Sequence, residues 1–219
     1  HFTAFVNGMS GIVQHLKKAE NAPQVYFVAY PRLGRGQNDA LADTSKVRKA
    51  NDFLQKMNQE ARKIAEARGA RYLNPRPYFD AATSKGGVLH AVDGVHFSEL
   101  GQNAIAFGIL KELGAPSLVS SVDLDFKGGA VELLQSQSAA VSELSGGADP
   151  VRIMFKRQDD GIPVYLGAAQ SAAYLKFIPF ESDLNRYELR VRGLPSGDYQ
   201  IKVNHQVIVE KISASTLGL

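Results

Sequence analysis

The chain has 219 residues, of which 44% are apolar, so it is long enough to bury one large core or two small ones. Charged residues make up 21%, an ordinary share for a globular protein, which argues against a wholly disordered chain. There is no cysteine, and this excludes disulfide frameworks, thiolate metal sites and a cysteine nucleophile. No run of eighteen apolar residues is present, so we expect no membrane span.

The net charge of +3 is unevenly spread along the chain. The first 116 residues carry 15 Lys and Arg against 10 Asp and Glu, and the remaining residues carry 10 against 12. Neither part has the density of basic residues that is typical of a nucleic-acid-binding surface. The basic residues between Lys46 and Arg71 are interleaved with acidic ones, which indicates a solvated helix face. We therefore expect no nucleic-acid partner.

The first half of the chain alternates helical and strand patterns. Apolar residues recur at helical spacing from Phe2 to Leu16, which predicts an opening helix. Residues 24–30 (QVYFVAY) are nearly all apolar, β-branched or aromatic, which is typical of a strand buried on both faces. We expect three further elements, in chain order: a helix capped by Thr44 and ended by Gly69, a strand over residues 71–73 closed by Pro75 and Pro77, and a helix from the N-cap Ser98 to Leu113.

This order predicts an α/β domain over residues 1–116, in which helices cover both faces of a parallel sheet. Two short strands cannot bury the apolar faces of three helices, and a two-stranded sheet is only marginally stable in water. We therefore expect further strands to be supplied by a missing N-terminal segment or by a second chain.

Residues 117–219 show a period of two instead of 3.6, which predicts a smaller, antiparallel β-rich region. Within it, residues 131–144 fit a helix or a strand equally well. Asn204 and His205 are expected to make a tight turn between two strands. The predicted strands are those with alternating apolar residues: Val122, Leu124 and Phe126; Val151, Ile153 and Phe155; Tyr187, Leu189 and Val191; Tyr199, Ile201 and Val203; and Val207 and Val209.

The strongest chemical signal is the segment AVDGVHFS, residues 91–98. Asp93 stands three residues before His96 on a loop that leads into a helix, where a carboxylate can hold an imidazole in one tautomer. Such an imidazole is fit to take a proton from a hydroxyl nucleophile, and Gly94 allows the loop to turn between the two residues. An Asp–His pair at this spacing is common by chance, so its place after a strand and before a capped helix is what favours a site.

The residues DGVHFSELGQNAIAFGILKELGAP resemble the last block of SGNH (GDSL-type) hydrolases, in which the Asp and His of the triad lie three apart. Gly101 also matches this block, whereas Phe97 replaces the proline commonly found there. The segments LGAPSLVSSVDLD and RYELRVRGLPSGDYQIKVNHQVI resemble the C-terminal extension of a bacterial subgroup. The resemblance implies a flavodoxin-like three-layer parallel sheet, only its later part in this chain, with an appended β region. It also favours a periplasmic or secreted location.

By this resemblance, Asp93 orients the imidazole, and His96 acts as general base and then as general acid in ester hydrolysis by a serine. The family's Gly-Asp-Ser block is absent from the sequence, so we expect the nucleophile to lie outside this chain and the isolated chain to be inactive. Ser10 lies mid-helix and lacks the strand-to-helix turn that a nucleophile needs. Asn38, in the sequence GQND, spells the family's oxyanion motif, but too few elements separate it from Asp93, which favours an ordinary loop asparagine.

The implied substrate is a small or carbohydrate-linked ester, and the mechanism needs no metal or organic cofactor. Three other interpretations stay open. His90, Asp93 and His96 stand at intervals of three and offer ligands for zinc, although such a repeat on an irregular loop does not by itself converge on a point. The chain can instead be a non-catalytic SGNH-like scaffold for binding or assembly. Its β region can also be a carbohydrate-binding module, which the lack of tryptophan argues against. Aromatic residues at core spacing are assigned to packing: Tyr26, Phe27, Phe53, Phe107, Tyr187 and Tyr199.

Overall fold

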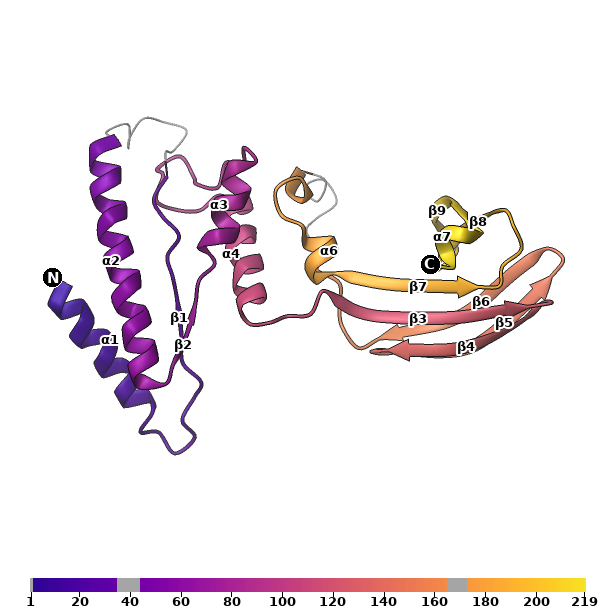
Figure 1. Ribbon diagram of the computed structural model, residues 1–219, viewed down its shortest axis with the longest axis horizontal. Coiled ribbons are helices and arrows are strands. Elements are labelled where there is room, and N and C mark those ends of the chain that lie inside the picture. The colour runs from indigo at the N-terminus through magenta and orange to yellow at the C-terminus, as the bar shows by residue number, and fades with distance from the viewer. Residues whose placement is uncertain (1, 35–43, 165–172) are drawn as a thin grey trace. The chain divides into compact units, whose positions relative to one another are not determined.

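The computed structural model describes residues 2–34, 44–164 and 173–219, and the chain divides into two units (Figure 1). The first unit comprises residues 1–115 and 166–180, and the second comprises residues 116–165 and 181–219. The elements of the first unit are α1 (Phe2–Leu16), β1 (Tyr26–Val28), α2 (Thr44–Arg68), β2 (Arg71–Leu73), α3 (Arg76–Ser84) and α4 (Glu99–Glu112). Those of the second are β3 (Leu118–Lys127), β4 (Ala130–Gln137), β5 (Ala139–Ala148), β6 (Val151–Asp159), β7 (Arg186–Arg192), β8 (Asp198–Val203), β9 (Gln206–Ser213) and α7 (Ala214–Leu217), and α6 (Phe180–Leu184) begins at the last residue of the first unit.

In the first unit, β1 and β2 pair in parallel. Phe27 lies opposite Tyr72 at the centre of the register, and the amide of Ala29 donates to the carbonyl of Leu73 at 2.9 Å. α1 and α2 lie on one side of this sheet, and α3 and α4 lie on the other (Figure 1). The α/β class is therefore confirmed. The flavodoxin-like sheet stays a prediction, because the described part of the first unit contains two strands.

The apolar stripes of α1 and α2 form a core with β1. α1 supplies one buried side chain to it and α2 supplies three, and the members of the core are Val13, Phe27, Ala61, Ile64 and Ala65. Gly69 follows α2 with a φ of 63°, a left-handed conformation that ends the helix as predicted. Thr44 begins α2, but its side chain, and with it the predicted cap, lies outside the described residues. No described helix is long and apolar enough to cross a membrane.

A helix that the sequence analysis did not predict, α3, follows β2 closely. Pro75 precedes its first residue and Pro77 is its second. At these positions a backbone N–H has no acceptor within the helix, so a proline costs no hydrogen bond. Phe79 and Ala82 are buried on its inner face. The two prolines therefore start a helix as well as ending the strand.

β1 is not buried on both faces, which corrects the prediction for residues 24–30. Phe27 is 6% exposed, whereas its neighbours Tyr26 and Val28 are 41% and 47% exposed. The reason is that β1 has one strand partner, β2, among the described residues. Phe53 of α2, also predicted to be in the core, is likewise exposed.

The second unit contains three small sheets within the residues described, with strand orders β4-β3-β7, β5-β6 and β8-β9. The ambiguous residues 131–144 form strands. The region is not wholly antiparallel as predicted, because β3 and β7 run parallel. The chain between them is long enough for the crossover that parallel neighbours need. Asn204 and His205 have φ values of 49° and 67°, which confirms the tight turn between β8 and β9.

A partly buried polar network joins β3 to β6 and β7. The Ser120 hydroxyl donates to the Asp159 carboxylate and accepts from Nη2 of Arg157 at 2.6 Å. Nε of Arg157 contacts Oδ1 of Asp159 at 2.8 Å, and its Nη1 donates to the carbonyl of Glu188 at 2.9 Å. Because the Ser120 hydroxyl already donates one hydrogen bond and accepts another, it is a structural residue and not an available nucleophile.

A close backbone contact at α4 gives a stability prediction. A Cβ atom on Gly101 would lie 2.0 Å from the carbonyl oxygen of Leu89, so Gly101→Ala is expected to destabilise the first unit by about 1–3 kcal/mol. Gly11→Ala is the control, since nothing lies within 4 Å of that Cβ; inside α1 it should stabilise by about 0.5–1 kcal/mol. Urea unfolding followed by far-ultraviolet circular dichroism measures both changes. Equal midpoints for the two variants would contradict the close contact.

Candidate active site

Asp93 and His96 are in direct contact on the loop between α3 and α4. Oδ2 of Asp93 lies 2.5 Å from Nδ1 of His96. An ionised carboxylate only accepts hydrogen bonds, so Nδ1 carries the hydrogen and Nε2 of a neutral ring keeps its lone pair. The His96 side chain is 82% exposed, so Nε2 is open to solvent. The structure therefore brings together the two residues that the sequence analysis singled out.

The backbone of the loop holds this pair in place. Oδ1 of Asp93 accepts hydrogen bonds from the amides of Val95 and His96, each at 2.9 Å. Gly94 has a φ of 69°, a left-handed conformation that glycine adopts without strain, as its place in the sequence predicted. The amide of Ala91 donates to the carbonyl of His96 at 2.8 Å and closes the turn. One carboxylate thus fixes both the loop and the ring.

The helix that follows anchors the other end of the loop. The hydroxyl of Ser98 accepts from the amide of Gly101 at 3.1 Å, which is the predicted N-cap of α4. The same hydroxyl donates to the carbonyl of Val88 at 2.7 Å, so the cap also ties the two ends of the loop together.

The hydrogen bonds to Asp93 lower the pKa of its carboxyl group to about 2, chiefly through the His96 ring and then through the two backbone amides. Asp93 is therefore ionised throughout the physiological range. At neutral pH the ring of His96 therefore contacts an ionised carboxylate.

Tyr30, two residues beyond the end of β1, contacts the loop. Its hydroxyl donates to the carbonyl of Val95 at 2.7 Å, and its ring lies 5.2 Å from the ring of Phe97. Burial, and then the charge of Asp93, raise the pKa of Tyr30 above its usual value, so the hydroxyl keeps its hydrogen at neutral pH. Tyr30 therefore links the carboxyl end of β1 to the Asp93–His96 turn.

Two asparagines of α2 bind the backbone of Tyr30 and of Leu33, three residues further on. Oδ1 of Asn58 accepts from the amide of Tyr30 at 3.2 Å, and its Nδ2 donates to the carbonyl of Tyr30 at 2.8 Å. Asn51 makes the same pair of bonds to Leu33, at 2.8 and 3.0 Å. Each side chain satisfies a backbone donor and acceptor as a neighbouring strand would.

His90 is a packing residue, not a partner of the exposed pair. It is buried, and its Nε2 donates to the carbonyl of Arg32 at 2.8 Å. The rings of Phe79 and Phe97 lie 5.3 and 5.6 Å from its own, and a Cβ on Gly34 would come within 2.2 Å of its Nδ1. Burial lowers the pKa of His90 below its usual value, so the ring is neutral at pH 7.

The zinc interpretation of residues 90, 93 and 96 finds no support in this geometry. The two imidazoles are engaged differently, His90 with the carbonyl of Arg32 and His96 with Asp93. Over residues 2–34, 44–164 and 173–219, no group of three or more His, Cys, Asp or Glu side chains is arranged to hold a metal ion.

The remaining candidates of the sequence analysis lie elsewhere. Ser10 is in the middle of α1, where no strand-to-helix turn exposes its hydroxyl. Asn38 and the rest of the GQND segment lie outside the described residues.

The sequence analysis overlooked Tyr30 and Asn58, although α2 carries a signal for the second. Asn51 and Asn58 fall within the apolar stripe that runs through Leu54 and Ala61 at helical spacing. A polar side chain in such a stripe needs a buried partner, and here the partner is the backbone beyond β1. No comparable pattern in the sequence marks Tyr30.

No family model and no curated protein matches the chain. A solved structure does: that of BT4096, a gut microbial diltiazem-metabolizing enzyme, with a TM-score of 0.76 and 17% sequence identity. The alignment covers 99% of this chain and 50% of that enzyme. The chain shares the fold of half of that enzyme. It spans about half the enzyme's length. At 17% identity, the similarity concerns the fold alone.

The lowered pKa of Asp93 predicts a titration at strongly acidic pH. The carboxyl is more acidic in the folded chain than its ordinary value of 3.8, so its hydrogen bonds are complete above about pH 4 and are lost as the pH falls towards 2. The amide resonances of Val95 and His96 should therefore shift with a midpoint of about 2 in an NMR titration. Asp93→Asn should abolish this shift. A midpoint near 3.8 in the unsubstituted chain would contradict the hydrogen-bonded geometry.

The buried His90 predicts a second pH dependence. Its pKa is lower in the folded than in the unfolded chain, so its contribution to stability is present above pH 6.5 and is lost as the pH falls below that value. His90→Gln should reduce the fall in Tm between pH 7.5 and pH 5. His15→Gln, at an exposed position of α1, should leave that fall unchanged. An unaltered pH dependence in His90→Gln would show that this ring is not held neutral by burial.

Proposed function

We propose that this chain carries the Asp–His part of a Ser-His-Asp ester hydrolase that resembles SGNH (GDSL-type) enzymes. The observation that supports it most directly is the contact between Asp93 and Nδ1 of His96, which leaves Nε2 free to act as a base. In this proposal residues 1–116 are the C-terminal part of the SGNH-like α/β domain, and residues 117–219 are its β-rich extension.

The proposed mechanism gives a role to each side chain of the pair. Nε2 of His96 takes the proton of a serine hydroxyl as the serine oxygen attacks the ester carbonyl, and Asp93 stabilises the resulting imidazolium. The ester C–O bond then breaks, and His96 returns its proton to the leaving alcohol. Water attacks the acyl-serine by the same route, which releases the acid and restores the serine. Asp93 stays ionised throughout, in keeping with its lowered pKa.

The serine and the oxyanion donors of this mechanism are expected from a polypeptide outside the 219 residues, either an N-terminal segment or a second chain. The high exposure of His96 fits this assignment, because a working base must be covered by substrate and by the residue that it activates. The fold likeness to an enzyme about twice as long is consistent with the proposal. The proposed substrate is a small or carbohydrate-linked ester, and diltiazem is a reasonable compound to include in a substrate screen.

Phe97, which departs from the family's proline, leaves the pair intact. Its ring packs against those of Tyr30, Phe79 and His90 at 5.2, 5.5 and 5.6 Å. The residue before it, His96, still reaches Asp93. Phe97 therefore packs the loop against Tyr30 and against Phe79 of α3.

The second candidate function is a non-catalytic SGNH-like scaffold for binding or assembly. The observation that favours it is the absence of a Gly-Asp-Ser block from the sequence. The sequence encoded upstream of His1 discriminates between the two: a Gly-Asp-Ser supports the hydrolase, and a Gly-Asp-Ala or Gly-Asn-Gly supports the scaffold.

A single substitution tests the hydrolase. In the protein that includes the upstream-encoded polypeptide, His96→Ala should lower kcat for p-nitrophenyl acetate by roughly 10²–10⁴-fold, because the base is lost. Asp93→Asn should also lower kcat, since the wrong tautomer then faces the serine. His15→Ala is the control and should turn over at the unsubstituted rate. Unchanged turnover in His96→Ala would remove the base from the mechanism, and strong turnover by the 219-residue chain alone would show that the serine is within it.

A further inference from the structure

We propose that the Asp160–Gly161 peptide is a site of spontaneous isoaspartate formation, and that the contacts of the active-site loop protect the identical peptide Asp93–Gly94 from this modification. These are the two Asp–Gly peptides of the sequence. Glycine after aspartate favours the reaction, because no side chain shields the glycine nitrogen and the glycine backbone turns freely. The chemistry needs only this chain and is independent of the proposed ester hydrolysis.

Isoaspartate forms in two balanced steps. The amide nitrogen of the glycine attacks the side-chain carboxyl carbon of the aspartate and forms a C–N bond. The nitrogen loses its proton and the carboxyl loses its hydroxyl group, and the two leave as water. A second water then opens the resulting succinimide ring. When it cleaves the bond to the former backbone carbonyl, the chain runs through the side chain, and the backbone is one carbon atom longer.

The carboxyl group of Asp93 is held by three hydrogen bonds. Its Oδ1 accepts from the amides of Val95 and His96, each at 2.9 Å, and its Oδ2 lies 2.5 Å from Nδ1 of His96. The amide of Gly94, which would be the attacking nitrogen, donates to the carbonyl of Ala91 at 3.0 Å. Closure of the succinimide ring therefore requires that these bonds break first.

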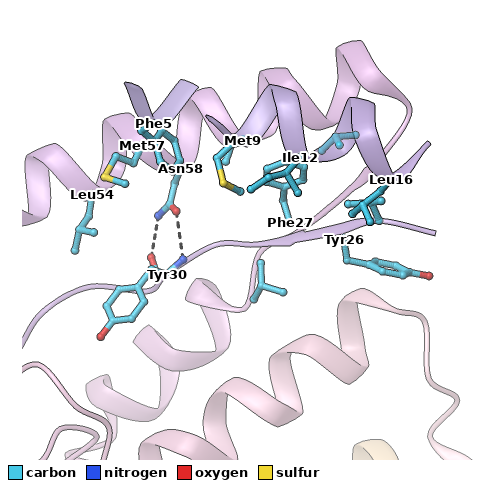
Figure 2. Close-up of a pocket in the computed structure, with 14 residues that line it drawn as sticks. Phe5, Met9, Ile12, Leu16, Tyr26, Phe27, Tyr30, Leu54, Met57 and Asn58 are labelled. Carbon is cyan, nitrogen blue, oxygen red and sulfur yellow. Dashed lines mark hydrogen bonds between the residues drawn. The ribbon is translucent and has the colours of Figure 1, made fainter. Parts of the chain in front are cut away.

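The peptide between Val95 and His96 is fixed from both sides. Its N–H donates to Asp93, and its C=O accepts from the hydroxyl of Tyr30 at 2.7 Å. The backbone of Tyr30 is bound in turn by the Asn58 side chain (Figure 2). Because this peptide supplies one of the bonds to the carboxylate, contacts beyond the loop also resist the opening of the turn.

Ionisation adds to this protection. The carboxyl group reacts as the neutral acid, since hydroxide is a far better leaving group than an oxide ion. The contact with His96, and then the two backbone amides, lower the pKa of Asp93 to about 2. At neutral pH the neutral acid is therefore a smaller fraction of Asp93 than of an aspartate with the ordinary pKa of 3.8.

Asp160 has no comparable contacts. It is exposed, directly after β6, and its own amide donates to the carbonyl of Ser138 at 3.0 Å. Within residues 2–34, 44–164 and 173–219, its carboxylate has no hydrogen-bond or ion-pair partner, and the amide of Gly161 has no acceptor. Both groups that react in succinimide formation are thus without the bonds that hold their counterparts in the active-site loop.

Isoaspartate at position 160 would lengthen the backbone between two anchored residues of the second unit. On one side, the Asp159 carboxylate accepts from the Ser120 hydroxyl. On the other side, the carbonyl of Gly161 accepts from the hydroxyl of Tyr187 at 3.2 Å. An added backbone carbon moves one anchor relative to the other, so the modification should lower the stability of this unit.

Ageing of the folded chain, followed by peptide mapping, tests the proposal. Trypsin places the two sites on separate peptides, residues 86–111 and 158–176, and electron-transfer dissociation locates isoaspartate within each. In the chain unfolded by guanidinium chloride, Asp93 and Asp160 should react at similar rates, because glycine follows both. In the folded chain, Asp160 should react at least about fivefold faster than Asp93, which must first lose its hydrogen bonds.

Variants of the active-site loop test what protects Asp93. His96→Ala removes an exposed ring that binds Oδ2, and it should speed isoaspartate formation at Asp93 by about three- to tenfold. Tyr30→Phe removes the bond to the Val95–His96 peptide and should speed it by about twofold or more. His15→Ala, at an exposed position of α1, is the control and should change nothing. The rate at Asp160 in the same samples is the internal reference.

Asp160→Glu tests the assignment in the second unit. Glutamate keeps the charge, but its additional methylene group prevents closure of the five-membered ring. Peptide 158–176 of this variant should contain no isoaspartate, and ageing should lower the urea midpoint of the unsubstituted chain but not that of the variant. Isoaspartate that persists in the variant would place the modification at Asp159, and an equal loss of stability in both chains would likewise overturn the assignment to Asp160.

Three further results would overturn the proposal. The first is a ratio of the two rates that is the same in the folded and the unfolded chain, because the structure would then protect neither site. The second is isoaspartate at Asp160 in the unfolded chain only, because the fold would then protect both sites. The third is an unchanged rate at Asp93 in both His96→Ala and Tyr30→Phe, because the contacts of the loop would then not be the source of the protection.

Discussion

Among the described residues β1 pairs with one strand, β2, and the rest of the first unit depends on this constraint. A parallel sheet normally has both faces and both edges of its inner strands covered. Here β1 pairs with β2, and α1 and α2 cover one face, yet the side chains of Tyr26 and Val28 are exposed. Within the part of the chain that the structure describes, no residue pairs with the backbone groups of Tyr26 and Val28. An apolar groove lined by α1, α2 and β1 (Figure 2) follows from the same geometry, since a helix that overhangs a sheet edge leaves space where a strand would lie.

The Asp93–His96 pair does not depend on a complete sheet. Its contacts are local: the carboxylate binds a ring and two amides within three residues of itself. Interactions this close in sequence form without any long-range partner, and Tyr30 and Ser98 then fix the loop against β1 and α4. The pair is therefore already oriented in a chain that has half the length of the enzyme it resembles in fold.

The sequence predicted those parts of the structure that local rules control. Helical spacing located α1, α2 and α4, and the three-residue spacing of Asp93 and His96, with Gly94 between them, predicted their contact. It did not predict α3, because prolines at residues 75 and 77 serve equally to end a strand and to start a helix. The sequence also did not predict the parallel pairing of β3 with β7 or the hydrogen bond from Tyr30 to Val95. Both join residues about 65 positions apart, and no periodicity in the sequence records such a contact.

The spacing of the two asparagines of α2 matches the spacing of the backbone groups that they bind. Asn51 and Asn58 are seven residues apart, which is about 10.5 Å along a helix, and their targets Leu33 and Tyr30 are three residues apart, which is about 10 Å along an extended chain. Because the two distances are nearly equal, both asparagines can reach their backbone targets at the same time. Inserting or deleting one residue between the asparagines, or between Tyr30 and Leu33, would move one asparagine side chain away from the backbone groups that it binds. A change in the length of this helix segment therefore keeps both pairs of hydrogen bonds only if the chain beside it changes length to match.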